Sequence, residues 1–68
     1  SGNPLDVLSK REKEVAMLLV NGNGNLEISN ALELQPTTVS TYKNRIFEKL
    51  GISNLSSLIA IFNLYHEA

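Results

Sequence analysis

Apolar residues recur at helical spacing in four stretches of the chain, and residues that favour turns separate these stretches. The first stretch, residues 10–20, carries an apolar stripe around Val15 and Leu19. Just before it, Ser9 and Glu12 have the spacing of a capping box, which starts a helix. A run of alternating asparagine and glycine follows and is typical of a loop. The pattern therefore predicts a first helix that ends at this run.

A short second helix is expected after the glycine-rich loop. Residues 25–32 contain apolar side chains at helical spacing, and Gly24 stands at their start as a weak N-cap. Only residues 33–35 then precede Pro36, which suits the first turn of a further helix because its missing N–H would have no partner there. The two helices are thus predicted to be joined by a turn of three residues.

The third stretch, Pro36 to Gly51, separates apolar from polar side chains. Val39, Ile46 and Leu50 lie on one side of a helix of about four turns. Small hydrogen-bonding side chains lie on the other side: Thr37, Ser40, Thr41 and Asn44. These residue types lower helix propensity, whereas a surface that only needs solvation favours glutamate and lysine. Short polar groups flanked by cations suit contact with base edges and phosphates. We interpret this helix as one that reads nucleic acid, against the alternative of an ordinary solvated surface.

The fourth stretch, residues 55–65, is apolar nearly all round. Asn54 can cap it, and Leu58, Phe62 and Tyr65 share one face that can cover the core. A terminal helix with apolar residues on its remaining surface indicates a partner subunit, unless these residues cover the core from an unusual angle. The side expected to pair comprises Ala60, Ile61 and Leu64.

Length and composition limit the possibilities further. The chain has 68 residues, enough for one small domain, and 43% of them are hydrophobic. It has no cysteine, which excludes disulfides and thiolate metal sites and fits a reducing cytoplasm. No apolar run approaches the roughly 20 residues of a membrane span. Residues 1–7 lack periodicity and are interpreted as a linker or tag remnant, which leaves residues 8–68 as the domain.

The distribution of charge matters more than its sum. The net charge of −1 counts against nucleic-acid binding, since such domains are commonly basic. The six cations, however, fall into two groups: Lys10, Arg11 and Lys13, then Lys43, Arg45 and Lys49. Residues 36–51 contain three cations and one acid, a local balance of +2. The first group could reach phosphate, but a solvated face with local ion pairs is the favoured interpretation.

No residues in the chain have the pattern of a catalytic, metal or cofactor site. The lone His66 stands beside the C-terminus without candidate partners and is interpreted as a solvated residue. We therefore expect neither an enzyme nor a bound cofactor or metal. A short helix, a three-residue turn and a longer helix with a polar outward face together make a helix-turn-helix. The predicted fold class is all-α, with four helices.

The motifs of these helices resemble a known family. The pattern L-S-K-R-E-K-E-V at residues 8–15 is followed by Gly22, by Glu27-Ile28, and by T-V-x-x-Y-x-x-x-I-x-x-K-L-G at residues 38–51. Together they resemble the LuxR/FixJ-type (GerE-like) DNA-binding domain of bacterial response regulators and quorum-sensing activators, and look most like the virulence-type two-component regulators. The resemblance covers residues 8–62, nearly the whole predicted domain.

The resemblance implies a role for each matching position. The third helix would lie in the major groove of double-stranded DNA, with base contacts from Thr37, Ser40, Thr41 and Asn44. Phosphate contacts would come from Thr38, Tyr42, Lys43, Arg45 and Lys49. It also implies a homodimer formed on DNA through the fourth helix, weak or monomeric when free, and a receiver or sensor domain ahead of this one. The chain departs from the family pattern at Gly24, Leu26 and Leu55, where serine, lysine and arginine are frequent.

We therefore expect the output module of a cytoplasmic bacterial transcription regulator that binds DNA sequence-specifically. From the residues alone, Asn44 is the best candidate for a paired contact to adenine, and Thr41 for a methyl contact to thymine. The alternative is a degenerate helix-turn-helix that docks on another protein, which the net charge and the apolar fourth helix favour.

Overall fold

The computed structural model describes residues 2–65, which contain helices and no strand. The elements are the 3-10 helix η1 (Pro4–Val7) and the α-helices α1 (Lys10–Val20), α2 (Asn25–Leu32), α3 (Pro36–Leu50) and α4 (Leu55–Tyr65). This confirms the predicted all-α class and its four α-helices. The predicted bounds of the third and fourth helices also agree with the structure.

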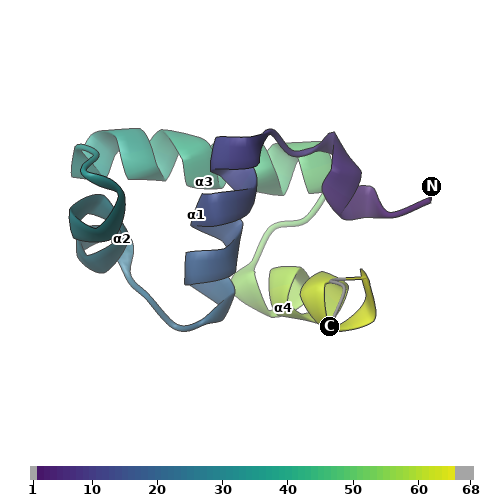
Figure 1. Cartoon of the computed structure of the whole chain (residues 1–68). Coiled ribbons are helices and arrows are strands. Elements are labelled where there is room, and N and C mark those ends of the chain that lie inside the picture. Colours follow the sequence, from purple (N-terminus) through teal and green to yellow (C-terminus); the bar gives the residue numbers. More distant parts are fainter. Residues whose placement is uncertain (1, 66–68) are drawn as a thin grey trace.

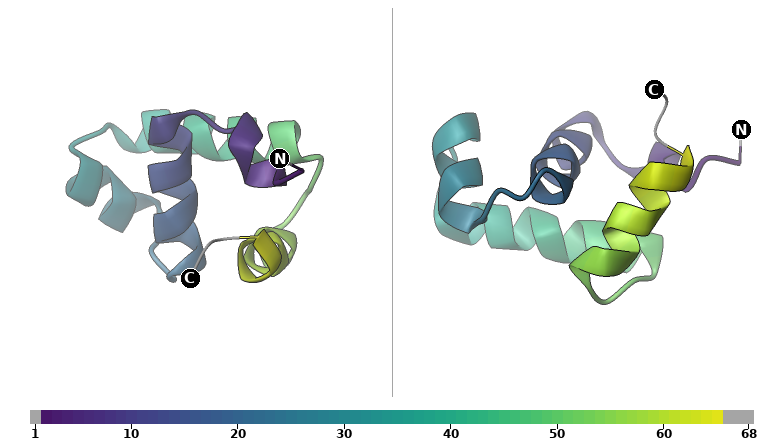
Figure 2. Two further views of the ribbon diagram at one scale, coloured as in Figure 1. Left: turned by 45° about the vertical axis from the view of Figure 1, so that its right-hand side comes forward. Right: turned by 90° about the horizontal axis from the view of Figure 1, so that it is seen from below.

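Helix α3 lies along one side of the molecule, and α1 crosses it (Figure 1). Helix α2 packs near one end of α3, and α4 follows the turn at the other end. Seen from below, α1 and α2 lie on the same side of α3 (Figure 2, right). The opposite side of α3 therefore faces away from the rest of the domain.

The core forms where α1, α2, α3 and α4 meet. Its most deeply buried side chains come from all four helices: Val15, Ile28, Val39, Ile46 and Leu58 are fully inaccessible to solvent. Ala16 and Leu19 of α1 and Phe62 of α4 complete the contact between these helices. The apolar stripe predicted for α3 therefore does cover the core, although Leu50 at its end is only partly buried.

The helix ends follow the local signals in the sequence. The Ser9 hydroxyl accepts from the Glu12 N–H, and the Glu12 carboxylate accepts from the Ser9 N–H, so the capping box is confirmed. Asn54 caps α4 by accepting from the Ser57 N–H at 2.8 Å. Gly24 has no side chain to cap α2, but its N–H donates to the Glu27 carboxylate. Gly51 ends α3 in the left-handed conformation at φ 68°.

The turn between α2 and α3 is fixed by side-chain and main-chain bonds together. Glu33 adopts a left-handed conformation, with φ 57°, and ends α2. The Leu34 N–H donates to the Ser29 carbonyl at 2.9 Å, while the buried Ser29 hydroxyl donates to the Leu34 carbonyl at 2.6 Å. These two bonds close the three-residue turn and set the direction in which α3 leaves α2.

Part of the segment interpreted as a linker or tag remnant, Pro4–Val7, is folded in the structure. These residues form η1, which packs against α3 and α4. Leu5 is 5% exposed and belongs to the core, and Asn3 caps η1 by accepting from the Leu5 N–H at 2.8 Å. Too few residues form this element for periodicity to be visible in the sequence. Whether the functional domain begins at residue 8 stays a prediction.

Replacement of Leu5 by Ala should destabilise the domain by about 2–4 kcal/mol, because it leaves a cavity at a buried position. Val7 belongs to the same element but is 53% exposed, so Val7→Ala should change the free energy of unfolding by less than about 0.5 kcal/mol. Urea denaturation of both variants measures this difference. Equal, small effects of the two substitutions would show that η1 adds nothing to the fold.

Candidate nucleic-acid interface

The outward face of α3 presents three of the four predicted base-reading side chains to solvent. Thr37, Thr41 and Asn44 are exposed. They lie opposite Val39 and Ile46, whose burial fixes the rotation of α3 about its axis. The Thr41 hydroxyl donates to the Thr37 carbonyl at 3.1 Å, one turn earlier. The helix therefore exposes short polar groups along its first two and a half turns.

Ser40 differs from the prediction that it faces solvent. Its side chain is half-buried at the edge of this face, where it accepts a hydrogen bond from the Asn25 amide of α2 at 2.9 Å. Asn25 was not singled out by the sequence, because its distance to Ser40 depends on how the turn orients α2 against α3. A hydrogen bond from α2 thus fixes the side chain at one edge of the outward face.

The predicted phosphate-contacting residues lie in three different environments. Arg45 is exposed beside the outward face. Thr38, Tyr42 and Lys43 are half-buried, and the Tyr42 ring packs against the core. Lys49 is engaged within the domain, because its ammonium donates to the Glu12 carboxylate at 2.8 Å. The three cations therefore do not form a single patch.

Glu12 connects the start of α1 to the last turn of α3. Its side chain is 4% exposed, whereas that of Lys49 is 42% exposed. The same carboxylate oxygen accepts from the Lys49 ammonium and from the Ser9 N–H, each at 2.8 Å. The hydrogen bond from Lys49, and then the one from Ser9, hold the pKa of Glu12 below its ordinary value of 4.5, although burial opposes them. Sequence reasoning found the cap but missed the ion pair, whose partners are 37 residues apart.

One acidic residue also lies on the outward face. Glu48 is exposed one turn after Asn44, towards the end of α3. A carboxylate there repels phosphate but can accept a hydrogen bond from a cytosine amino group. Its place on the helix is evident from the sequence.

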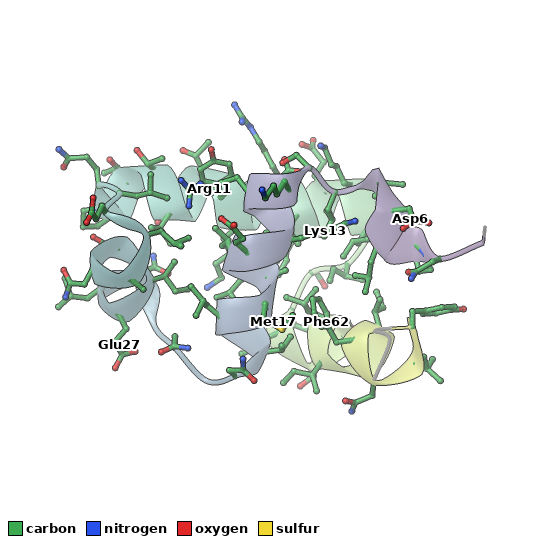
Figure 3. The ribbon with its side chains drawn as sticks, viewed as in Figure 1. Asp6, Arg11, Lys13, Met17, Glu27 and Phe62 are labelled. Atoms are coloured by element: carbon green, nitrogen blue, oxygen red, sulfur yellow. The ribbon has the colours of Figure 1, made fainter. Side chains whose placement is uncertain are left out.

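The cations at the start of α1 are separate from the outward face of α3. Arg11 forms an exposed ion pair with Glu14 at 2.9 Å, in line with the predicted solvated face. Figure 3 shows Arg11 and Lys13 projecting from different sides of α1. An open groove of about 500 Å³ follows this helix and is lined by Lys10, Lys13, Glu14, Met17, Leu18 and Leu32.

Helix α4 requires a correction to the predicted pairing surface. Ile61 is half-buried and packs against the core, so the expectation that it points away from Leu58 and Phe62 is wrong. Helical periodicity shows which side chains of α4 share a face, but it does not show how α4 is oriented against the core. Leu64 is 76% exposed, and Ala60 one turn earlier is also exposed. Leu55, Ile59 and Tyr65 of the same helix are exposed as well, so the free apolar surface of α4 consists of other residues than predicted.

Within residues 2–65, no three histidine, aspartate or glutamate side chains are grouped so that they could hold a metal ion. In the same part of the chain, no helix combines the length and apolar composition needed to cross a membrane. His66, interpreted above as a solvated residue, lies outside the described residues.

Comparison with known proteins identifies the family. Residues 6–62 match the family model for bacterial regulatory proteins of the luxR family. This chain belongs to that family. The match covers all four α-helices up to Phe62, and it confirms the resemblance that the motifs of these helices indicate. The chain is accordingly a helix-turn-helix domain of the luxR type.

Relatives of this luxR-type domain are response regulators. The response regulator GacA of Pseudomonas protegens is 48% identical over 54 residues, which are 79% of this chain and 25% of the relative. GacA of Pseudomonas viridiflava is 46% identical over 54 residues, with the same coverage. The virulence-factor transcription regulator BvgA of Bordetella pertussis is 44% identical over 55 residues, 81% of this chain and 26% of the relative. The predicted likeness to virulence-type regulators is confirmed.

The luxR-type domain spans about a quarter of the length of these curated relatives. No solved structure matches the chain.

The buried Glu12 should make stability depend on pH. Because its pKa is lower in the folded than in the unfolded chain, the ionised carboxylate stabilises the fold above pH 4.5, and this contribution is lost as the pH falls through the folded-state pKa. Below pH 4.5, the free energy of unfolding should therefore fall more steeply for the wild type than for Glu12→Gln. Urea denaturation at a series of pH values measures both slopes.

Glu14→Gln is the matched control, since Glu14 is an exposed carboxylate on the same helix. It should leave the acid dependence close to that of the wild type. Identical slopes for the wild type and Glu12→Gln would contradict the role of the Glu12–Lys49 pair.

Proposed function

We propose that this domain binds double-stranded DNA sequence-specifically, with α3 in the major groove, as the output domain of a bacterial transcription regulator. The observation that carries the proposal is the outward face of α3. It exposes Thr37, Thr41 and Asn44 on a helix that a helix-turn-helix projects from the domain. A major groove about 12 Å wide admits such a helix. The luxR membership of the chain supports this placement.

Base readout is assigned to Thr37, Ser40, Thr41 and Asn44. The exposed Asn44 amide can donate and accept at once, which matches the N6 and N7 edge of adenine. The Thr41 hydroxyl already donates to the helix main chain, so its methyl group is the part best suited to a contact with thymine.

Phosphate contacts are assigned to Thr38, Tyr42, Lys43, Arg45 and Lys49. Arg45 is the clearest of these, because it is exposed and has no ion-pair partner among residues 2–65. Lys49 has three N–H donors, of which Glu12 accepts one, so the others can still reach a phosphate. A substitution of Lys49 would therefore affect the fold and DNA binding together.

The domain is proposed to act as part of a longer, dimeric regulator. The relatives named above are regulators about three times as long as this chain, which supports a receiver domain ahead of it. Pairing on DNA is assigned to the α4 surface formed by Ala60 and Leu64, of which Leu64 is 76% exposed. The small area of this surface favours a monomer in the absence of DNA.

A titration on duplex DNA with the salt concentration varied tests the proposal. Binding should weaken as salt rises, and Arg45→Ala should reduce the slope of log K against log salt by about one unit. Lys13→Ala is the matched control, since it removes an exposed cation of α1 and should leave the slope unchanged. Absence of DNA binding even at low salt would contradict the proposal and favour the protein-docking alternative.

Substitution of Asn44 tests base readout. Asn44→Ala should weaken binding to the preferred site by roughly 1–3 kcal/mol and relax the preference at one base pair, because the paired contact is lost. Binding to an unrelated duplex serves as the internal control and should change little. If the variant keeps the wild-type preference across all single-base variants of the site, Asn44 does not read a base.

Substitution of Leu64 tests pairing through α4. Leu64→Glu places a charge on the exposed pairing surface, so it should abolish cooperative binding to a two-fold repeat and change half-site binding little. Circular dichroism checks that the variant is folded. Cooperativity that survives in a folded Leu64→Glu domain would rule out pairing through this residue.

A further inference from the structure

The contact between Asn25 and Ser40 joins α2 to the edge of the outward face of α3. The Asn25 amide nitrogen lies 2.9 Å from the Ser40 hydroxyl oxygen and donates to it. Both side chains are half-buried, and they are 15 positions apart in the sequence. The bond therefore holds the Ser40 side chain in one orientation before any DNA is bound.

This bond determines which hydrogen-bonding capacity Ser40 retains. A serine hydroxyl has one donor and two acceptor sites, and Asn25 occupies one of the acceptor sites. The hydroxyl hydrogen of Ser40 has no acceptor among residues 2–65. Thr41 differs, because its hydroxyl hydrogen is directed to the Thr37 carbonyl. Unlike Thr41, Ser40 thus keeps its hydroxyl donor available while its side chain is held by α2.

We propose that Asn25 is a positioning residue for DNA recognition: it orients Ser40 so that the hydroxyl donates to an acceptor atom on a base edge. This inference rests on the proposed function of α3. The acceptors in the major groove are N7 of both purines, O6 of guanine and O4 of thymine. Asn25 itself touches no base in this arrangement. It acts through Ser40, and it makes part of the specificity of α3 depend on a residue of α2.

A merely structural tie between α2 and α3 predicts a different outcome. Loss of such a tie lowers the free energy of unfolding and weakens binding to all DNA sequences alike. A positioning role predicts a change in preference at one base pair, the one that Ser40 contacts. The preference at that base pair is therefore the deciding measurement.

Two substitutions of Asn25 separate these roles. In Asn25→Asp the side chain can only accept, so the Ser40 hydroxyl turns its hydrogen to the carboxylate and its donor is lost to DNA. In Asn25→Ala the hydroxyl is no longer held. Asn30 is an exposed residue of the same helix, so Asn30→Asp and Asn30→Ala are controls matched in charge and size.

The experiment measures binding of each variant to the preferred site and to its single-base variants. Discrimination is the ratio of the affinity for the preferred site to the affinity for a single-base variant. In both Asn25 variants this ratio should fall roughly three- to tenfold at one base pair, as expected for the loss of one hydrogen bond. Ser40→Ala should lose the same discrimination at the same base pair. Asn25→Asp combined with Ser40→Ala should lose no more than either substitution alone. The Asn30 controls should keep the discrimination of the wild type.

Three results would overturn the inference. Unchanged discrimination in both Asn25 variants would leave Asn25 a structural tie only. An equal loss of discrimination in Asn30→Asp would show that the added charge causes the change. Additive losses in Asn25→Asp and Ser40→Ala would show that Asn25 does not act through Ser40. Failure of the proposed function is distinguishable, because the wild-type domain itself would then show no base preference.

Discussion

The burial of one side of α3 is the constraint on which the rest of the domain depends. Val39 and Ile46 are inaccessible to solvent, on a helix against which α1 and α2 both pack. Burial of these two residues fixes the rotation of α3, and Thr41 and Asn44 must then face outwards. The turn closed by Ser29 fixes the direction of the helix in the same way. Core packing and the geometry of recognition are thus two consequences of one arrangement.

The contact between α1 and α3 adds an electrostatic constraint to this apolar packing. Glu12 is the only charged side chain buried among the described residues, and its carboxylate is satisfied by Ser9 on its own helix and by Lys49 on α3. Removal of one partner of a buried charge is more destabilising than the pair is stabilising. Lys49 therefore has a structural role besides the phosphate contact assigned to it, and Arg45 reports on phosphate binding more cleanly.

Local signals in the sequence predicted the α-helices well, whereas contacts between elements could not be predicted. The Ser9 capping box and the glycine at position 51 depend on neighbouring residues only, so they are visible in the sequence. The core position of Leu5, the partial burial of Ile61, and the Asn25–Ser40 bond depend on how helices approach one another. The same holds for the candidate site. The sequence predicted which side of α3 faces outwards, but not the hydrogen bonds that tie Ser40 to α2 and Lys49 to α1.

The central claim is that DNA contacts the outward face of α3. An NMR titration of the isotope-labelled domain with a duplex that carries its preferred site, followed through backbone and side-chain amide signals, tests this most directly. The account predicts that the largest shifts fall on residues 36–45 and on the Asn44 side-chain amide, with intermolecular contacts to major-groove protons, while Lys13 and Met17 on the groove of α1 change little. Shifts confined to α4 and the α1 groove, with α3 unchanged, would contradict it.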